Sequence, residues 1–178
     1  KLAQLPYPVR LQIDGKGDLL VLDRKLRKIG RVGAGGDFAG YLDIQGVASP
    51  SAVVPVAFKV DGAGQVHVLD AGGDRVLVLD PGGKLVREIG LPKSGSFTDI
   101  AVDGAGRVYA VEAVEAAVWV AEPGAASFKE LSRSLKDRLS FPGYVTTHLG
   151  KLVVVDQNGA AIVVLGQDGS YQGRELGM

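Results

Sequence analysis

The sequence has no cysteine, only two histidines and a single tryptophan among its 178 residues. Without cysteine the chain can form neither a disulfide nor a thiolate metal site, and it has no cysteine nucleophile. Two histidines cannot supply a metal site that needs three histidine ligands. Lysine plus arginine equals aspartate plus glutamate, at 20 each, which disfavours a main task of binding nucleic acid or an anionic membrane. No apolar run approaches the ~20 residues of a membrane-spanning helix.

Glycine, by contrast, is abundant, at 26 residues, and hydrophobic residues make up 46% of the chain. This composition is typical of a folded protein and not of a disordered one. Glycine without a collagen period favours many tight turns, and therefore many short strands. The chain is long enough to bury a core, either as one domain or as a series of small repeats.

One segment recurs four times along the chain, at intervals of about 44 residues. The copies read IDGKGDLLVLD at 13–23, VDGAGQVHVLD at 60–70, VDGAGRVYAVE at 102–112 and, most divergent, TTHLGKLVVVD at 146–156. Around the second copy the sequence predicts strands at 56–60, 65–69, 75–79 and 85–90, joined by glycine turns. The strands grade from apolar to polar, as expected when only the outermost has a free edge. We therefore expect an all-β fold, a β-propeller built of about four four-stranded antiparallel blades.

The whole chain, 1–178, is expected to be one propeller segment. Its blades are predicted at 8–32, 55–91, 98–132 and 144–177, with a long connection at 31–55 between the first two. The basic segment 24–31 is assigned to the outer strand of the first blade. Apolar residues at near-helical spacing predict one short helix within 128–140.

The units resemble the NHL repeat, whose six-bladed propellers serve as binding platforms. The second unit carries the resemblance, through Val60, Asp61, Gly64, Asp70, Gly73, Asp74, Arg75 and Gly90. The other units match in part, since Ala117 and Ala161 stand where the second unit has its arginine. Four units are fewer than that family's ring, so three arrangements stay open: a piece of a longer propeller, an open arc closed by a partner, or a closed four-bladed ring. Because an open arc exposes apolar faces, we expect further blades or another subunit to cover its ends.

Candidate binding residues fall in three places. Asp74 and Arg75 form a turn pair, and the resemblance implies that this arginine supports neighbouring turns on one rim. His148 lies in a turn. Five cations gather in one segment: Arg24, Lys25, Arg27, Lys28 and Arg31. The positive charge of this segment would favour RNA binding. An alternating strand, however, would divide the charges between two faces, and no aromatic residues lie among them. We therefore expect a solvent-exposed strand edge.

Structural roles are expected for the repeated carboxylates. Asp14, Asp61 and Asp103 precede glycine turns and should accept backbone N–H groups. The same holds for the carboxylates that end the second strands: Asp23, Asp70, Glu112 and Asp156. His67 is expected to pack between blades and Trp119 to lie in the core. Gly64 and Gly106 should adopt positive φ.

Together these features favour a non-catalytic scaffold that presents rim loops to a protein or peptide partner, without cofactor, metal or catalytic residues. One alternative is a propeller lyase or lactonase-like hydrolase whose site needs blades outside this chain, because two histidines and the single Asn158 cannot complete the metal sites of such enzymes. A second alternative is an RNA-binding platform of the NHL type. The chain begins with lysine, as a processed protein would, so we expect a bacterial, extracytoplasmic (periplasmic or secreted) protein.

Overall fold

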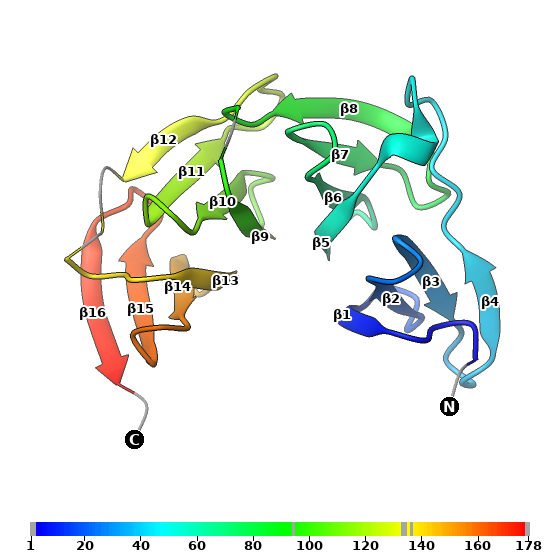
Figure 1. The fold of residues 1–178 in the computed structure, drawn as a ribbon, viewed down its shortest axis with the longest axis horizontal. Coiled ribbons are helices and arrows are strands. Elements are labelled where there is room, and N and C mark those ends of the chain that lie inside the picture. The colour runs from blue at the N-terminus through cyan, green and yellow to red at the C-terminus, as the bar shows by residue number, and fades with distance from the viewer. Residues whose placement is uncertain (1–2, 94, 133–134, 136, 177–178) are drawn as a thin grey trace. The chain divides into compact units, whose positions relative to one another are not determined.

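The structure is a computed structural model that describes residues 3–93, 95–132, 135 and 137–176 (Figure 1). The described strands form four antiparallel sheets of four strands each, and every sheet is ordered as its strands follow one another in the chain. Each sheet is a blade of a β-propeller, as the sequence predicted. The one described helical element is a short 3-10 turn at Pro50–Ala52. Among the described residues, no helix is long and apolar enough to cross a membrane.

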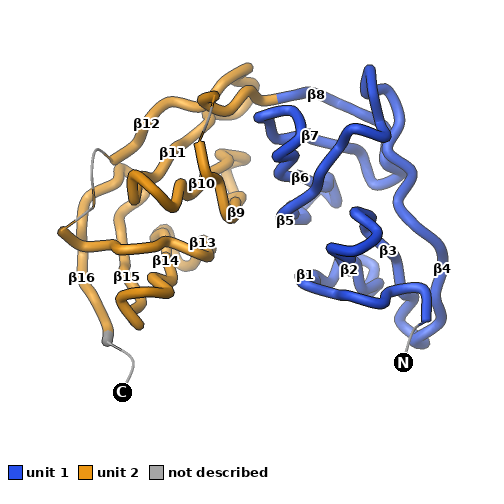
Figure 2. The backbone as a smooth tube through the Cα atoms, viewed as in Figure 1, with its two compact units in different colours: residues 1–88 blue, residues 89–178 orange. Residues whose placement is uncertain are grey.

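The chain divides into two compact units, residues 1–88 and 89–178, with the boundary inside strand β8 (Figure 2). Unit 1 contains two blades. Blade 1 consists of β1 (Pro8–Ile13), β2 (Leu19–Asp23), β3 (Lys28–Val32) and β4 (Phe38–Tyr41). Blade 2 consists of β5 (Pro55–Val60), β6 (Val66–Asp70), β7 (Arg75–Leu79) and β8 (Leu85–Gly90).

Unit 2 contains the other two blades. Blade 3 consists of β9 (Phe97–Val102), β10 (Val108–Glu112), β11 (Ala117–Ala121) and β12 (Lys129–Ser132). Blade 4 consists of β13 (Pro142–His148), β14 (Lys151–Asp156), β15 (Ala161–Gly166) and β16 (Tyr171–Leu176). The strands of blade 2 match those predicted from the sequence, and Gly64 and Gly106 adopt the predicted positive φ, at 80° and 82°.

Each unit buries its core between its two blades. In unit 1, Leu20 and Leu22 of β2 pack against Phe58, Val68 and Leu77 of blade 2. In unit 2 the alternate residues of β10 and β11 pack against those of β14 and β15; the buried set includes Tyr109, Val111, Val118, Val120, Leu152, Val154, Val163 and Leu165. The second and third strands of each blade are mostly apolar on both faces. One face packs against the other blade of the unit, and the residues of the other face are largely buried as well.

The structure corrects the prediction for blade 1. The basic segment is not the outer strand, because β3 begins at Lys28 and a further strand, β4, pairs with it, with Gly30 opposite Tyr41. Blade 1 therefore extends to Tyr41 and not to residue 32. The glycine-rich turn at 33–36, in which Gly36 has a φ of 90°, makes this hairpin possible. The expected connection at 31–55 shortens accordingly to 42–54.

The structure also corrects part of the prediction of a helix within 128–140. Lys129–Ser132 forms β12, which pairs with β11 and places Glu130 opposite Trp119. Edge pairing satisfies the backbone here in place of helical hydrogen bonds. Residues 133, 134 and 136 of the predicted helix lie outside the described residues.

Candidate functional site

In blades 1, 2 and 3, one aspartate organises the turn between the first and second strands. Asp14, Asp61 and Asp103 each accept two backbone N–H groups of their own turn through Oδ1, at 2.9–3.0 Å. This confirms the structural role expected for these three residues. The second carboxylate oxygen, Oδ2, stays available in each case, and it takes a different partner in each blade.

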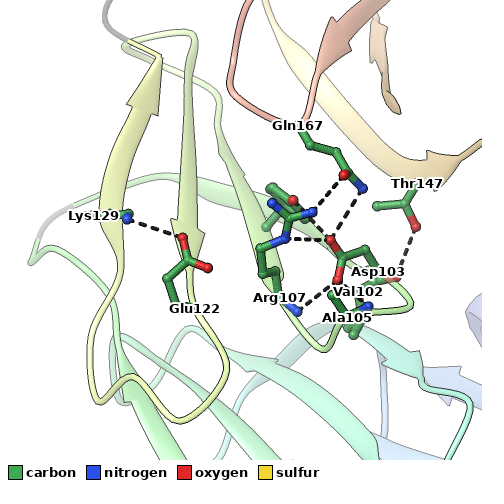
Figure 3. Close-up of polar contacts among 9 residues, drawn as sticks. Val102, Asp103, Ala105, Arg107, Glu122, Lys129, Thr147 and Gln167 are labelled. Atoms are coloured by element: carbon green, nitrogen blue, oxygen red, sulfur yellow. Dashed lines mark hydrogen bonds and ion pairs between the residues drawn. The ribbon is translucent and has the colours of Figure 1, made fainter. Parts of the chain in front are cut away.

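In unit 2 the free oxygen of Asp103 is the centre of a polar cluster that joins blade 3 to blade 4 (Figure 3). Asp103 Oδ2 accepts from Arg107 Nε at 2.7 Å, from the Tyr109 hydroxyl at 3.1 Å and from Gln167 Nε2 at 3.3 Å. Arg107 Nη2 in turn donates to Gln167 Oε1 at 2.6 Å. Nearby, the Thr147 hydroxyl of blade 4 donates to the Val102 carbonyl of blade 3 at 3.0 Å. The cluster therefore acts as a cross-link between blades.

Electrostatics fix the protonation states in this cluster. Burial tends to raise the pKa of Asp103, but the Arg107 backbone N–H and the Arg107 guanidinium outweigh it, so the pKa of that carboxyl is lowered. Burial, reinforced by the charge of Asp103, raises the pKa of Tyr109 to about 12. At neutral pH the carboxylate is thus ionised and the phenol is protonated, so the Tyr109 hydroxyl donates a charge-assisted hydrogen bond to Asp103.

In unit 1 an arginine also links two blades through the second oxygen of the turn aspartate, but this arginine lies in β3 and not in the turn before the second strand. Arg31 of β3 donates to Asp14 Oδ2 at 2.7 Å, lies 3.4 Å from Asp18 Oδ2, and reaches the Pro81 carbonyl of blade 2 at 3.2 Å. Burial tends to raise the pKa of Asp14, but turn N–H groups and Arg31 prevail and lower it. The predicted candidate Arg31 is therefore a link between blades, held apart from the rest of the basic segment.

His67 occupies the position in blade 2 that Tyr109 occupies in blade 3. Its imidazole is 2% exposed, and Nε2 lies 2.9 Å from Asp61 Oδ2. Burial lowers the pKa of His67 although the Asp61 carboxylate opposes that effect. Within the described part of the chain, its Nδ1 has no hydrogen-bond partner. The histidine is thus a buried neutral residue of the interior, as expected.

The carboxylates that end the second strands form a repeated latch. Asp23, Asp70, Glu112 and Asp156 are all at most 5% exposed. Each accepts an N–H from the segment just before the first strand of its blade, the donors being Tyr7, Val54, Ser96, and Ser140 with Phe141. Each also accepts an N–H from the turn that follows the second strand. The latch carboxylates therefore fix the entry of the chain into every blade.

The remaining predicted candidates do not come together in one site. Arg75 binds Asp70 at 3.0 Å and both oxygens of Glu88 at 3.0–3.1 Å, so it anchors blade 2, whereas Asp74 is an exposed turn residue with a φ of 47°. His148 is exposed at the end of β13. Of the basic segment, Lys28 lies 4.9 Å from the centre of the Tyr41 ring, and the others apart from Arg31 are exposed turn residues: Arg24, Lys25 and Arg27.

A hollow of about 590 Å³ opens beside the Arg31 link, and we call it the unit 1 hollow. Its walls are residues 14–16, 39–43, 62–64 and 81–82, together with Asp18 and Arg31. Sequence reasoning missed it because its walls come from three separate turns and from strand β4 with the residues after it. The Arg107–Gln167 contact was missed as well. The sequence gives one signal for this contact: the last turn of blade 4 has the polar residue Gln167 at the position equivalent to Pro81 of blade 2.

Trp119 also differs from the prediction. It is half-buried and not enclosed in the core, and its ring lies edge-on to Phe97, with centroids 6.3 Å apart. Both rings line a second, smaller hollow of about 250 Å³ in unit 2, which we call the Trp119 hollow.

Comparison with known proteins identifies the fold alone. No protein-family model matches the sequence, and no curated protein matches it. Similar solved structures include a catalytically inactive virginiamycin B lyase from Staphylococcus aureus with quinupristin (20% identity, TM-score 0.73) and a streptogramin B lyase (17%, 0.74). A chain of a nidogen/laminin complex is also similar (16% identity, TM-score 0.72). The matches cover 95%, 95% and 98% of this chain but 55%, 54% and 65% of those chains, so the chain spans about half the length of the two lyases. This chain is thus a β-propeller protein whose relatives in structure include both enzymes and a protein of a protein–protein complex.

Proposed function

We propose that this chain is a non-catalytic β-propeller scaffold, of the NHL-like type that its second unit resembles, which binds a peptide segment of a partner protein in the unit 1 hollow. The observation that carries the proposal is the hollow itself. It measures about 590 Å³, within the range of ligand sites, and its walls are turns and strand β4 of the two blades of unit 1.

The chemistry of the walls suits a peptide. A Cβ built on Gly15, Gly40 or Gly62 would meet no atom within 4 Å, so the backbone at these positions is open to a ligand. Backbone N–H and C=O groups can pair with the main chain of an extended peptide. The walls also carry charges of both signs, with Asp14, Asp18 and Asp43 against Lys16 and Arg31, which suits a polar segment rather than a lipid.

The polar groups elsewhere favour binding over catalysis. The turn aspartates and the latch carboxylates are already hydrogen-bonded to backbone N–H groups, so they serve the fold. The described residues contain no group of three or more His, Asp or Glu side chains suited to hold a metal ion. The nidogen/laminin structure is a precedent for a similar fold in a protein–protein complex.

Two matched glycine substitutions test the proposal. Gly62→Arg places a long side chain into the unit 1 hollow, and Gly104→Arg makes the same change in the equivalent turn of blade 3. Neither glycine has positive φ, and neither Cβ would meet an atom within 4 Å, so both variants should fold. A phage-displayed random peptide library is selected against the wild-type chain, and individual peptides are then titrated. We expect the selected peptides to bind wild type and Gly104→Arg but not Gly62→Arg. Equal binding to all three proteins, or no enriched peptide, would contradict the proposal.

The alternative, a propeller enzyme whose site needs blades outside this chain, is favoured by the two lyases among the similar structures. It predicts turnover of a lyase substrate and a bound metal ion in the complete protein. Chromatography of quinupristin incubated with the protein, together with metal analysis, would reveal a new product and bound zinc or calcium. Neither result is expected from a binding scaffold.

RNA binding by the basic segment 24–31 is the second alternative. Three of its five cations are exposed in one turn, which supports it. Arg31, however, is paired with Asp14, and Lys28 rests on Tyr41, so the positive charge is divided. Binding of a single-stranded RNA that weakens steeply with salt, and is lost in Arg24→Gln with Arg27→Gln, would establish this function.

We further propose that another blade, from the same or a second chain, covers the face of blade 4 that points away from blade 3. Tyr144, Val155 and Ile162 form one cross-strand row there and are 40%, 36% and 44% exposed. The residues of blade 3 at the positions equivalent to Val155 and Ile162 are Val111 and Val118, and both are buried against blade 4. Light scattering should show that this chain alone self-associates and that Ile162→Lys makes it monomeric. A wild-type chain that is already a stable monomer would refute this arrangement.

A further inference from the structure

Blade 3 departs from the repeat at three positions that the strand register makes equivalent in all four blades. Opposite the latch carboxylate, the other blades have a proline, and blade 3 has Phe97; the prolines are Pro8, Pro55 and Pro142. The latch carboxylate itself is an aspartate elsewhere and Glu112 here. In the third strand, where the other blades have Gly30, Leu77 and Val163, blade 3 has Trp119.

These three departures coincide in space, because all three side chains line the Trp119 hollow. The two rings stand at 70° to each other, and the Phe97 ring lies directly over Gly95, where no Cβ would fit. Glu112, which is 5% exposed, and Glu115 both line the hollow. Larger residues than those of the other blades therefore surround an open space of about 250 Å³ and do not fill it.

The polar atoms at the hollow retain unused hydrogen-bonding capacity. Glu112 accepts one N–H on each oxygen, from Ser96 at 2.7 Å and Glu115 at 2.5 Å, whereas an ionised carboxylate can accept about four. The indole Nε1–H of Trp119 is buried and has no acceptor among the described residues. A ligand in the hollow that pairs with the Glu112 carboxylate must carry a hydrogen-bond donor.

We propose that the Trp119 hollow binds the cationic side chain of an arginine or lysine within a peptide. A cation over the face of tryptophan or phenylalanine is attracted by the ring, and tryptophan is the best such partner. The lining contains two carboxylates, Glu112 and Glu115, and one cation, Lys93, so its formal charge favours a positive group. The volume is below the roughly 300–1,000 Å³ of sites for drug-sized ligands, which suits one side chain.

This site is separate from the unit 1 hollow and does not depend on it. Within unit 2 it lies at the Glu112 end of β10, whereas the Asp103 cluster lies near the other end of that strand. It adds to the proposed scaffold a second contact with a defined chemical preference.

Because Trp119 is the single tryptophan of the chain, tryptophan fluorescence reports binding at this site. Tryptophan fluorescence is followed while N-acetyl-arginine amide, or its neutral isostere N-acetyl-citrulline amide, is titrated at low salt. We expect a saturable change with arginine at a Kd of about 1 mM, near the weak end of specific binding, and at least about 5-fold weaker binding of citrulline. Equal responses to both probes, or no response to arginine, would overturn the proposal.

Variants locate the response. Phe97→Pro restores the residue of the other three blades, so it should fold and lose the arginine response. Glu115→Gln should weaken binding about 5-fold, whereas Lys93→Gln should strengthen it. The matched control is Glu122→Gln, an exposed blade 3 carboxylate paired with Lys129 outside the hollow, which should change nothing. Unchanged affinity in both Phe97→Pro and Glu115→Gln would refute the site. Gly62→Arg should leave this titration intact, so failure here and failure of the unit 1 proposal are distinguishable.

Discussion

Removing the latch carboxylate of blade 2 should destabilise the protein strongly, although the residue lines neither hollow. Asp70 is fully buried and accepts from Val54 N at 2.8 Å, from Gly72 N at 3.0 Å and from Arg75 Nε at 3.0 Å. In Asp70→Ala, two part-buried backbone N–H groups lose their acceptor. Arg75 keeps Glu88 as a partner, so its loss is partial.

The magnitude follows from these contacts. Each buried donor left unsatisfied costs about 1–3 kcal/mol, and the weakened ion pair adds to it, so we expect a total loss of about 3–5 kcal/mol in the free energy of unfolding. For a chain of this length that is a fall in Tm of about 6–20 °C. Asp70→Asn can keep Oδ1 as the acceptor of the two backbone donors, but it replaces the acceptor of Arg75 Nε with an amide donor; its cost should still be smaller than that of alanine, about 1–2 kcal/mol.

Thermal and urea unfolding, followed by circular dichroism, measure both losses. The matched control is Asp74→Asn, four residues away in the same turn but exposed, and with a positive φ that asparagine tolerates; it should stay within about 0.5 kcal/mol of wild type. If Asp70→Ala and Asp74→Asn had the same stability, the latch would contribute nothing and the interpretation of all four latch carboxylates would fail.

Three further predictions concern the turns and the response to pH. Gly64→Val should cost about 1 kcal/mol or more, because φ is 80°, whereas Gly62→Val in the same turn should cost less; equal melting of the two would contradict the strain argument. Because the pKa of His67 is lowered below its usual value, the unfolded chain binds more protons, so stability should fall as pH drops from about 7 toward 5, and His67→Gln should flatten that dependence in urea titrations. The pKa of Asp103 is also lowered, so its contribution is present above about pH 4 and is lost as pH falls through the folded value; Asp103→Asn should be less stable at neutral pH and less sensitive to acid.

Local signals in the sequence were sufficient for most of the fold. Glycine turns and β-branched runs at a fixed period predicted the strands of blade 2, because turn chemistry and alternation act within a few residues. Blade 1 was misassigned because β3, KIGRV, contains a glycine and charged residues and therefore resembles an outer strand. In the structure, Leu5 and Phe38 cover Gly30; a Cβ there would lie 2.8 Å from Leu5 Cδ2 and 3.0 Å from the Phe38 ring. Residues distant in the sequence thus supply the apolar cover that the strand itself lacks, and no local pattern reveals them.

The links between blades were hidden for a related reason. Asp14 and Asp103 are equivalent in the repeat, and so are Pro81 and Gln167 in the last turn of the next blade. The arginine that joins each pair, however, comes from β3 in unit 1 and from the turn before β10 in unit 2. Aligning the repeats compares position with position, so Arg31 and Arg107 are never matched. In both units a guanidinium group binds Oδ2 of the turn aspartate. A buried carboxylate oxygen requires a donor, and an arginine in either element can supply it. A repeat can therefore keep an interaction while changing the residue that makes it, and only the three-dimensional register shows that the two arginines do the same task.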